Sequence, residues 1–345
     1  MKTKAAILTE LNSPLVLDEI EIPSLDVGQV LVKIERTGIC GAQIGEISGA
    51  KGPDKYLPHL LGHEGGAVVL ETGPGVTHVR KEDHVVMHWR KGAGIHARPA
   101  TYQWNGRTVN SGWVTTFSEY SVVSENRLTP IGKEIDFEAA ALMGCAVTTG
   151  LGLINNDAQL KIGQSIAVLG CGGVGLNVIQ GAAMVAGDPI IAIDIHDKKL
   201  EMARSFGATH LINSGKADLR EDVRKIVGPK GVDVFVENTG LVRLIEKAYE
   251  LTAQAGRVIL VGVPRHDQDI TIHSLPLHFG KVLTGCEGGH TYPTTDIPRY
   301  LRLYQTGKLD LDRLITHRFP GLESINEALD AVRAGDVGKC VIVMS

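Results

Sequence analysis

Aromatic residues and long apolar runs are both scarce in this chain of 345 residues. Phe, Trp and Tyr together make up 5% of the sequence, so the core must consist mainly of Val, Ile, Leu and Ala. No stretch reaches the ~18 consecutive apolar residues that a membrane-spanning helix needs. The N-terminal segment turns polar before a signal sequence could develop. We therefore expect a soluble, cytoplasmic protein without a membrane partner.

Cysteine is also sparse, and the five cysteines are widely scattered, at positions 40, 145, 171, 286 and 340. An odd number at such spacings does not fit a disulfide framework and indicates reduced thiols or metal ligands. A basic excess is missing as well, because 35 Lys and Arg stand against 39 Asp and Glu, a net charge of -4. That balance argues against a nucleic-acid partner, which usually meets a concentrated basic face.

Glycine is abundant, with 41 residues, and the pattern of the chain changes near residue 150. Before that point, short β-type runs separated by turn signals predict a mostly antiparallel barrel or sandwich. After it, strands alternate with helix-length segments, which predicts parallel βαβ units. A mixed tail follows and ends in an apolar strand. The expected fold class is therefore α/β: a Rossmann doubly wound parallel sheet over 151–287, inserted into a mostly β domain formed by 1–150 and 288–345.

A glycine-rich turn, Gly170-Cys-Gly-Gly-Val-Gly175, stands between a predicted strand and the next helix. Its members Gly170, Gly172, Gly173, Val174 and Gly175 would let the backbone approach a pyrophosphate at the positive end of that helix. Asp194 ends the following strand, at about the ~20-residue distance expected of an acid that binds the adenosine ribose. Lys199 lies a few residues further on. We interpret the turn as a binding site for NAD; the alternative is an ordinary strand–helix turn.

Three islands, far apart in the sequence, carry residues of the kind that bind zinc: Gly38-Ile-Cys-Gly, Gly62-His-Glu-Gly and Met143-Gly-Cys-Ala. A buried cysteine or a single histidine has an ordinary structural explanation when it stands alone. Together, Cys40, His63 and Cys145 could supply two thiolates and an imidazole to Zn²⁺ and leave a fourth position for water or substrate. Glu64 would place a carboxylate close to the same metal.

With these islands in front of a dinucleotide turn, the chain resembles the zinc-type alcohol dehydrogenases of the medium-chain dehydrogenase/reductase superfamily over essentially its whole length. The tail is similar to the class I/III and benzyl-alcohol branch. The segments that carry the resemblance are Gly38-Ile-Cys-Gly, Leu61-Gly-His-Glu, Thr116-Phe-Ser-Glu-Tyr, Gly144-Cys-Ala-Val-Thr-Thr-Gly, Gly170-Cys-Gly-Gly-Val-Gly and Leu314-Ile-Thr-His.

The resemblance implies a GroES-like catalytic domain and a coenzyme domain with a cleft between them. It implies that the strand at 281–286 pairs with its own copy, so that the chain forms a homodimer; an assembly of two dimers is the alternative. It also implies roles for individual residues, with Cys40, His63, Glu64 and Cys145 at the catalytic zinc, Thr149, Val174 and Val261 around the nicotinamide, Lys339 at the pyrophosphate in place of the usual arginine, and Trp89 in the substrate pocket.

Two departures from the family pattern stand out. The four closely spaced cysteines of the family's structural zinc are missing between His84 and Phe117, so we expect one catalytic zinc per chain and no structural zinc. The family also often carries a hydroxyl residue and a histidine that relay the alcohol proton, whereas this chain has Ala42 and Gly45 there. An aspartate that usually stands beside them is replaced by Gln43.

The function expected from these features is a zinc-dependent transfer of hydride between an alcohol, or its aldehyde or ketone, and NAD(H). Zinc would stabilise an alkoxide while hydride passes to the nicotinamide. A polyol or sugar-derived alcohol, possibly phosphorylated, is the alternative substrate, because His88, Arg90, Lys91, His96, Arg98 and Arg107 form a basic segment, although such segments usually are solvated surface. A nucleotide-binding protein without dehydrogenase turnover is the alternative from another class.

Overall fold

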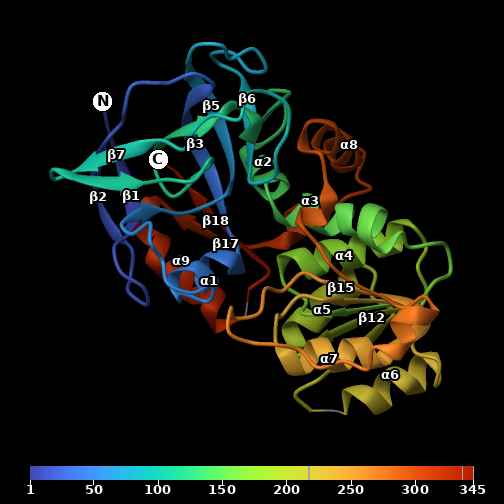
Figure 1. Cartoon of the computed structure of the whole chain (residues 1–345). Helices are drawn as coiled ribbons and strands as arrows, with labels where there is room; N and C mark the ends of the chain where they lie inside the picture. Colours follow the sequence, from blue (N-terminus) through green and yellow to red (C-terminus); the bar gives the residue numbers. More distant parts are fainter. Residues whose placement is uncertain (217, 336, 345) are drawn as a thin grey trace. The chain divides into compact units, whose positions relative to one another are not determined.

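The computed structural model describes residues 1–216, 218–335 and 337–344 (Figure 1). Its contacts divide the chain into two compact units. The first unit combines Met1–Thr148 with Tyr292–Ser345, and the second unit is Thr149–Thr291. The chain therefore leaves the first unit once, completes the second unit, and then returns.

Mostly antiparallel strands build the first unit. Strands β1, β2, β7, β8 and β4 close into a small barrel, and a larger sheet runs in the order β10-β6-β5-β3-β18-β17, with β9 paired to β3. Because β18 pairs with β3 and β17 pairs with β18, the C-terminal tail completes the larger sheet. The bounds are β1 (Lys2–Leu8), β2 (Val16–Glu21), β3 (Gln29–Ile39), β4 (His59–Leu60), β5 (Glu64–Thr72), β6 (His84–His88), β7 (Thr101–Trp104), β8 (Arg107–Asn110), β9 (Tyr120–Ser124), β10 (Leu128–Ile131), β17 (Ile315–Pro320) and β18 (Lys339–Val343).

Short helices connect and cover these strands. Asp136 caps α2, because its carboxylate accepts the backbone N–H of Ala139 at 2.7 Å. Among the described residues no single helix is both long and apolar enough to cross a membrane; one bent pair, 137–143 with 146–158, meets that test only when its two members are joined. The bounds are α1 (Gly41–Ile47), η1 (Glu125–Arg127), α2 (Phe137–Met143), α3 (Ala146–Gly152), α8 (Pro293–Gln305), η5 (Asp312–Leu314), η6 (Leu322–Ser324) and α9 (Ile325–Ala334).

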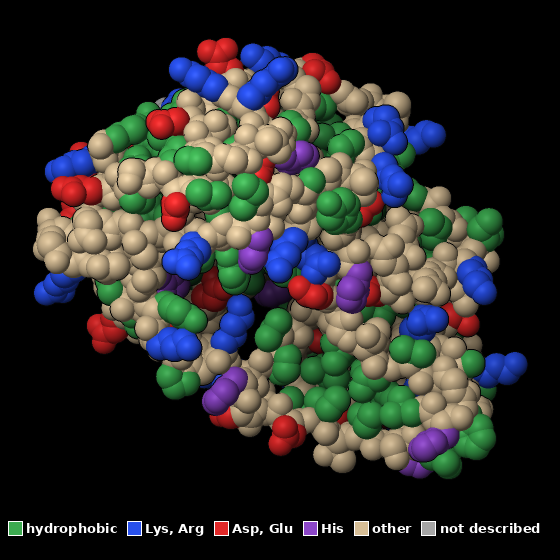
Figure 2. All heavy atoms as spheres, turned by 45° about the horizontal axis from the view of Figure 1, so that its top comes forward, with side chains coloured by type: hydrophobic (Ala, Val, Ile, Leu, Met, Phe, Trp, Pro, Cys, Tyr) green, Lys and Arg blue, Asp and Glu red, His purple; other side chains and the backbone are tan. Residues whose placement is uncertain are grey.

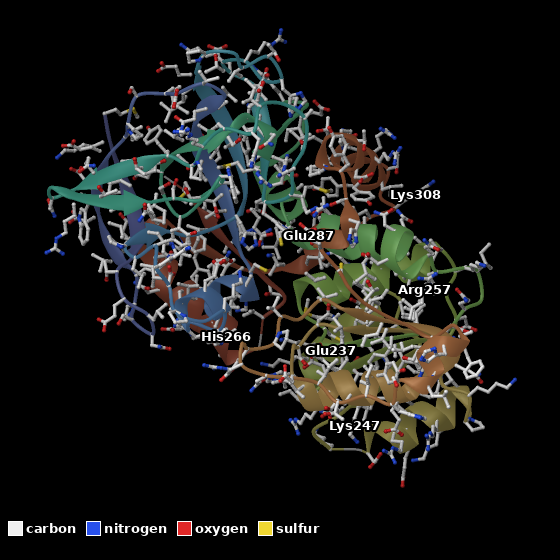
Figure 3. All side chains as sticks on the ribbon, viewed as in Figure 1. Glu237, Lys247, Arg257, His266, Glu287 and Lys308 are labelled. Carbon is white, nitrogen blue, oxygen red and sulfur yellow. The ribbon has the colours of Figure 1, made fainter. Side chains whose placement is uncertain are left out.

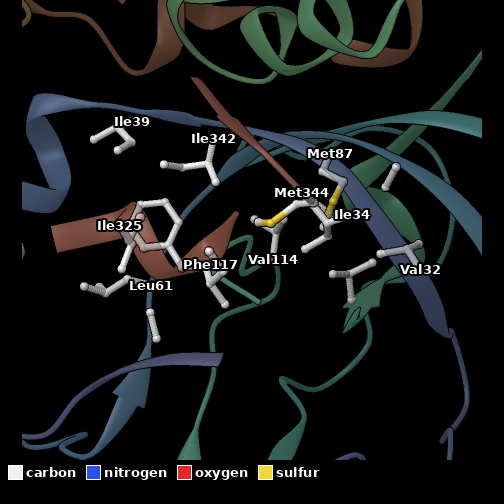
Figure 4. Close-up of a cluster of buried hydrophobic side chains, with 14 of the residues drawn as sticks. Val32, Ile34, Ile39, Leu61, Met87, Val114, Phe117, Ile325, Ile342 and Met344 are labelled. Atoms are coloured by element: carbon white, nitrogen blue, oxygen red, sulfur yellow. The ribbon is translucent and has the colours of Figure 1, made fainter. Parts of the chain in front are cut away.

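The main core of the first unit lies between its larger sheet and α9. Figure 4 shows Ile325 of α9 and Ile342 of β18 near Phe117, and Ile34 of β3 beside Met344 in the same core. Phe117 is completely buried, whereas most other members of this core are aliphatic. The low aromatic content of the sequence is thus reflected in a core of Val, Ile and Leu that holds strands from both ends of the chain together.

The second unit is built on a parallel sheet in the order β13-β12-β11-β14-β15-β16. Every neighbouring pair in this sheet is parallel. Counted along the chain this is the order 3-2-1-4-5-6 of dinucleotide-binding folds, in which ligands bind at the carboxyl ends of the strands where the order reverses. That point lies between β11 and β14. The bounds are β11 (Ile166–Leu169), β12 (Ile190–Asp194), β13 (His210–Asn213), β14 (Val232–Glu237), β15 (Thr252–Leu260) and β16 (Val282–Gly285).

Helices cover both faces of the parallel sheet, and Figure 1 shows α4 on one face with α6 and α7 on the other. The strands β11 and β12 are therefore buried along their whole length and consist almost entirely of apolar residues. The α/β class and the parallel sheet predicted from the sequence are confirmed. The bounds are η2, a π-helix (Leu153–Ala158), α4 (Gly173–Met184), α5 (Asp197–Ser205), α6 (Leu219–Val227), α7 (Val242–Leu251), η3 (Leu275–Phe279) and η4 (Gly288–His290).

Candidate metal centre and coenzyme site

Three metal-ligand candidates stand at the ends of regular elements in the first unit. Cys40 follows β3 and precedes α1, His63 directly precedes β5, and Cys145 directly precedes α3. Because β3 and β5 are paired antiparallel, the C-terminal end of β3 lies beside the N-terminal start of β5. The fold thus brings together residues that lie 23 and 82 positions apart along the chain (63 − 40 and 145 − 63).

The ligand atoms of Cys40, His63 and Cys145 all lie within 4.8 Å of one another, and this set could hold a metal ion. Nε2 of His63 is buried and has no hydrogen-bond partner among the described residues. An unpartnered buried nitrogen is costly unless another group takes up its lone pair. Two sulfur atoms and one imidazole nitrogen are the donor set of a catalytic zinc site that keeps a fourth position open. The residues present therefore fit Zn²⁺.

Glycines beside the ligands allow the backbone to approach Glu64 closely. A Cβ atom on Gly144 would lie 2.3 Å from the carbonyl oxygen of Met87 and 2.8 Å from Cα of Glu64. A Cβ atom on Gly38 would lie 2.8 Å from Cδ of Glu64. These separations are too short for any side chain, so packing requires Gly38 beside the carboxylate of Glu64 and Gly144 between the backbones of Met87 and Glu64.

The two thiols of the site are electrostatically unequal. A hydrogen bond from Cys145 holds the pKa of the Cys40 thiol well below its usual value, and His63 adds to this effect against the cost of burial. The same hydrogen bond, together with burial, raises the pKa of Cys145 well above its usual value. The pKa of His63 is raised, because Cys40 and Glu64 outweigh burial, which lowers it. Metal binding at this site would therefore release the proton that the two sulfurs share.

Glu64 and Lys339 form a buried ion pair next to the ligands. Their side chains are 0% and 4% exposed, and the Lys339 ammonium also donates to the carbonyl oxygen of Ile39 at 3.1 Å. Burial raises the pKa of Glu64, although Lys339 opposes this shift. Burial would lower the pKa of Lys339, but Glu64 and the thiols outweigh it and the pKa is raised. Two of the three N–H groups of the Lys339 ammonium thus already donate, to Glu64 and to Ile39. The contact of the third N–H group with a pyrophosphate stays a prediction.

The glycine-rich turn lies in the second unit between β11 and α4. A Cβ atom on Gly175 would lie 2.0 Å from the carbonyl oxygen of Gly170, so the helix can pack against the end of the strand only with glycine there. A Cβ atom on Gly172, by contrast, would meet no atom within 4 Å. The helix therefore begins at Gly173 with open space in front of its N-terminal N–H groups, as a pyrophosphate site requires.

Asp194 is fixed at the end of β12 beside this turn. Its carboxylate accepts the backbone N–H of Cys171 at 2.8 Å and that of His196 at 3.0 Å. Each carboxylate oxygen has a second lone pair, so both can still accept ribose hydroxyls. Lys199 is partly buried in the first turn of α5, whereas Lys198 is exposed. The turn and the acid thus meet in the second unit, as the spacing of the motif predicts.

The residues expected around the nicotinamide belong to the same unit. The hydroxyl oxygen of Thr149 is buried and has no hydrogen-bond partner among the described residues. Val174 and Val261 are partly exposed, and the N–H of Val261 is bonded to the carbonyl oxygen of Glu237 at 2.8 Å. Their contacts with the coenzyme stay predictions.

Trp89 is partly buried against the main core of the first unit, and its ring lies 5.8 Å from the Arg90 guanidinium. His88, one of the basic residues of this segment, is removed from the surface. His88 is buried, bonds to the Arg90 carbonyl and to Thr129, and burial lowers its pKa to about 4. On the face shown in Figure 2, Lys and Arg side chains are interspersed with Asp and Glu.

Three polar side chains near the two sites lie outside the predicted set of ligand and coenzyme residues, and only Gln43 is noted in the sequence, as the replacement of a family aspartate. Gln43 of α1 reaches both Cys40 and His63. Asn238, which follows β14, donates to the carbonyl oxygens of Leu169 at 3.1 Å and Gly170 at 3.3 Å. Glu237, labelled in Figure 3, is buried and accepts the backbone N–H groups of the next turn. For Asn238 and Glu237 the only sequence signal is their position at the carboxyl end of β14, a strand of the parallel sheet.

A zinc-capable Cys–His–Cys set on a β domain and a dinucleotide turn on a parallel sheet define a zinc-binding dehydrogenase. The sequence matches the Alcohol dehydrogenase GroES-like domain over residues 26–133 and the Zinc-binding dehydrogenase family over residues 173–306. It is 34% identical to an S-(hydroxymethyl)glutathione dehydrogenase of Escherichia coli O1:K1 and 32% identical to one of Paracoccus denitrificans, covering 99% of this chain and 100% of each relative.

Among solved structures, the benzyl alcohol dehydrogenase of Acinetobacter calcoaceticus is similar with a TM-score of 0.89 and 26% identity over 100% of both chains. The chain therefore belongs to the zinc-type alcohol dehydrogenases of the medium-chain dehydrogenase/reductase superfamily. It is an enzyme that oxidises or reduces at an alcohol carbon with a nicotinamide coenzyme. The expected family, fold and activity are confirmed, and a nucleotide-binding protein without turnover is not favoured.

Replacing Cys145 by Ala should remove the metal and leave the coenzyme site intact, because the two sites are built on different residues in different units. We expect elemental analysis to find about one zinc per wild-type chain and none in the variant. NADH binding, followed by fluorescence, should change by less than about threefold, which is under 1 kcal/mol. Cys340→Ala is the matched control, because this cysteine is buried in the core and should leave the zinc content unchanged. Two zinc ions per wild-type chain, or full zinc in Cys145→Ala, would contradict the assignment.

Proposed function

We propose that this protein oxidises a primary alcohol to its aldehyde, or catalyses the reverse reaction, with NAD(H) and with one zinc held by Cys40, His63 and Cys145. The observation that carries the proposal is the convergence of three soft donor atoms within 4.8 Å, with Nε2 of His63 left without a partner among the described residues. Zinc bound there would polarise the alcohol oxygen and lower its pKa. The two thiolates would balance the charge of the metal and leave a position for substrate.

The proton of the alcohol has no side-chain relay along α1. Ala42 and Gly45 carry neither a hydroxyl nor an imidazole, so neither can accept or pass a proton. Ala42 is exposed, and solvent therefore reaches this part of the helix. We infer that the proton leaves through water rather than through α1.

A single zinc per chain is supported by a buried carboxylate that stabilises the region where the family holds its structural zinc. Glu125 is completely buried, and its carboxylate accepts the backbone N–H groups of Thr77, His78 and Ile95, each at 2.6 Å. These bonds tie segments on both sides of β6 to one charged group. A carboxylate with three N–H donors is strongly stabilised when buried, so the segment has an anchor that needs no metal.

A primary alcohol is proposed because the named substrates of two similar proteins, S-(hydroxymethyl)glutathione and benzyl alcohol, both contain a CH₂OH group. The test is a panel of simple, aromatic and phosphorylated alcohols, with reduction of the coenzyme followed by absorbance. We expect turnover with unphosphorylated primary alcohols that stops when a chelator removes zinc. Turnover confined to phosphorylated alcohols would contradict this substrate class, and chelator-resistant turnover would contradict the role of zinc.

Asp194 supports NAD rather than NADP as the coenzyme. The 2′-phosphate of NADP would bring negative charge against a carboxylate that the backbone holds in place. For unit charges ~4 Å apart the repulsion lies between roughly 1 and about 4 kcal/mol, depending on the dielectric. At ~1.4 kcal/mol per tenfold, this corresponds to a preference on the order of tenfold to a thousandfold for NAD.

Asp194→Ala should therefore reduce the ratio of kcat/KM for NAD over NADP, because it removes both the ribose acceptor and the repulsion. Asp197→Ala, which changes an exposed acid three residues on, is the control and should leave the ratio within about twofold, since an exposed charge is strongly screened. Equal efficiency of the wild type with both coenzymes would show that Asp194 is not the ribose acid.

We further propose that the chain acts in the cytoplasm as a homodimer joined through β16. This strand ends the parallel sheet and pairs only with β15 within the described residues. An open strand edge is a site for pairing with another chain. Exposed Leu275, Leu277 and Phe279 of η3 directly precede the strand and could be covered in the same contact.

Sedimentation equilibrium at micromolar concentration should therefore give about twice the 37.0 kDa of one chain. Leu283→Pro would remove a backbone donor from β16 and should shift the mass toward that of a monomer. Since proline can also disturb the sheet itself, Phe279→Glu serves as a second variant that leaves the backbone unchanged. A wild-type monomer would contradict the proposed contact, and a tetramer would show that two dimers assemble further.

A further inference from the structure

The side chain of Gln43 connects two of the three candidate zinc ligands. Gln43 lies in the first turn of α1 and is 0% exposed. Its amide oxygen accepts the backbone N–H of Cys40 at 2.9 Å, and its amide nitrogen contacts Nδ1 of His63. The neutral amide of Gln43 therefore contacts both the backbone of Cys40 and the imidazole ring of His63.

Metal binding through Nε2 of His63 requires a hydrogen-bond acceptor at Nδ1, where the amide of Gln43 lies. A neutral imidazole that offers Nε2 to a metal carries its proton on Nδ1, and this N–H usually donates to an acceptor. The atom of Gln43 that contacts Nδ1 is the amide nitrogen, which is a donor only. The metal-bound ring would thus meet a donor where it needs an acceptor.

Reversing the amide does not satisfy both neighbours. If the oxygen turned toward Nδ1 of His63, the amide nitrogen would face the N–H of Cys40, whose acceptor is now that same oxygen. Two N–H groups then compete for one oxygen at a fully buried position. A buried donor without a partner opposes the state in which it occurs, and here that state is the metal-bound one.

We propose that Gln43 is a positioning residue that weakens zinc binding, because it supplies one acceptor where the Cys40 N–H and the His63 Nδ1–H require two. A carboxylate of the same shape would accept both. This inference rests on the proposed function only in taking zinc as the metal at Cys40, His63 and Cys145. Partners of metal-bound histidines typically change affinity by about 10–100-fold when altered, which sets the size of the expected effect.

The test is the zinc affinity of the metal-free protein, measured by competition with a chromophoric chelator rather than by activity. Gln43→Glu preserves the shape of the side chain and should bind zinc about 10–100-fold more tightly than the wild type. Gln43→Met removes the donor that opposes the Nδ1–H of His63 but supplies no acceptor, so it should bind zinc more weakly than Gln43→Glu. Thermal denaturation of each metal-free variant shows whether it folds.

A negative charge near the site could tighten zinc binding without any hydrogen bond, and Glu46→Gln controls for this. Glu46 lies on α1 one turn after Gln43, and its charge acts on His63 without a hydrogen bond to the ring. A change of less than about threefold in Glu46→Gln, together with tighter binding in Gln43→Glu, supports the proposal. Equal or weaker binding in a folded Gln43→Glu, or an equally large change in Glu46→Gln, overturns it. A wild type that binds no zinc would instead contradict the proposed function.

Discussion

The buried ion pair between Glu64 and Lys339 is the interaction on which the metal centre depends. Glu64 begins β5 and Lys339 begins β18, and both strands pair with β3. Removing two charges from water is expensive, and breaking such a pair by removing one partner leaves the other charge buried and uncompensated. The first unit therefore needs β18 paired with β3 on the side opposite β5, which accounts for a domain assembled from both ends of the chain. Gly38 is required by the carboxylate of Glu64, and Gly144 by the backbones of Met87 and Glu64, since no Cβ atom fits at either position.

Buried carboxylates that accept backbone N–H groups organise the loops throughout the molecule. Glu125 holds three N–H groups in the first unit, Asp194 holds the glycine-rich turn, and Glu237 holds the turn after β14. The N–H donors offset part of the hydration that each carboxylate loses on burial; at Glu237 burial still outweighs them and raises the pKa. The result is a set of loops held by hydrogen bonds, in which none of the five cysteines, all within the described residues, forms a disulfide. The same kind of bond fixes Asp194 beside the glycine-rich turn.

The sequence points to the three candidate ligands and to the glycine-rich turn, because each lies in a short local motif. Cys40, His63 and Cys145 lie in short motifs whose glycines are explained by close packing, and the dinucleotide turn is one continuous segment. The partners that adjust these groups are harder to predict. Lys339 meets Glu64 across 275 positions of sequence, and Glu125 binds Thr77 across 48. Such contacts depend on sheet pairing between distant segments, and no local pattern in a single sequence specifies them.

The departures from the family pattern that concern the proton relay gather on α1, and their position explains why ligation and proton handling can change separately. Ala42, Gln43 and Gly45 all lie on this one helix, whereas His63 and Cys145 are held by other elements. The helix can therefore lose its relay side chains and exchange a carboxylate for an amide without moving two of the three ligands. What changes is the surroundings of Cys40 and His63, because Gln43 contacts both residues. The candidate ligand atoms are held by several elements of the first unit, while the residues proposed to control the proton and the metal affinity lie on one short helix.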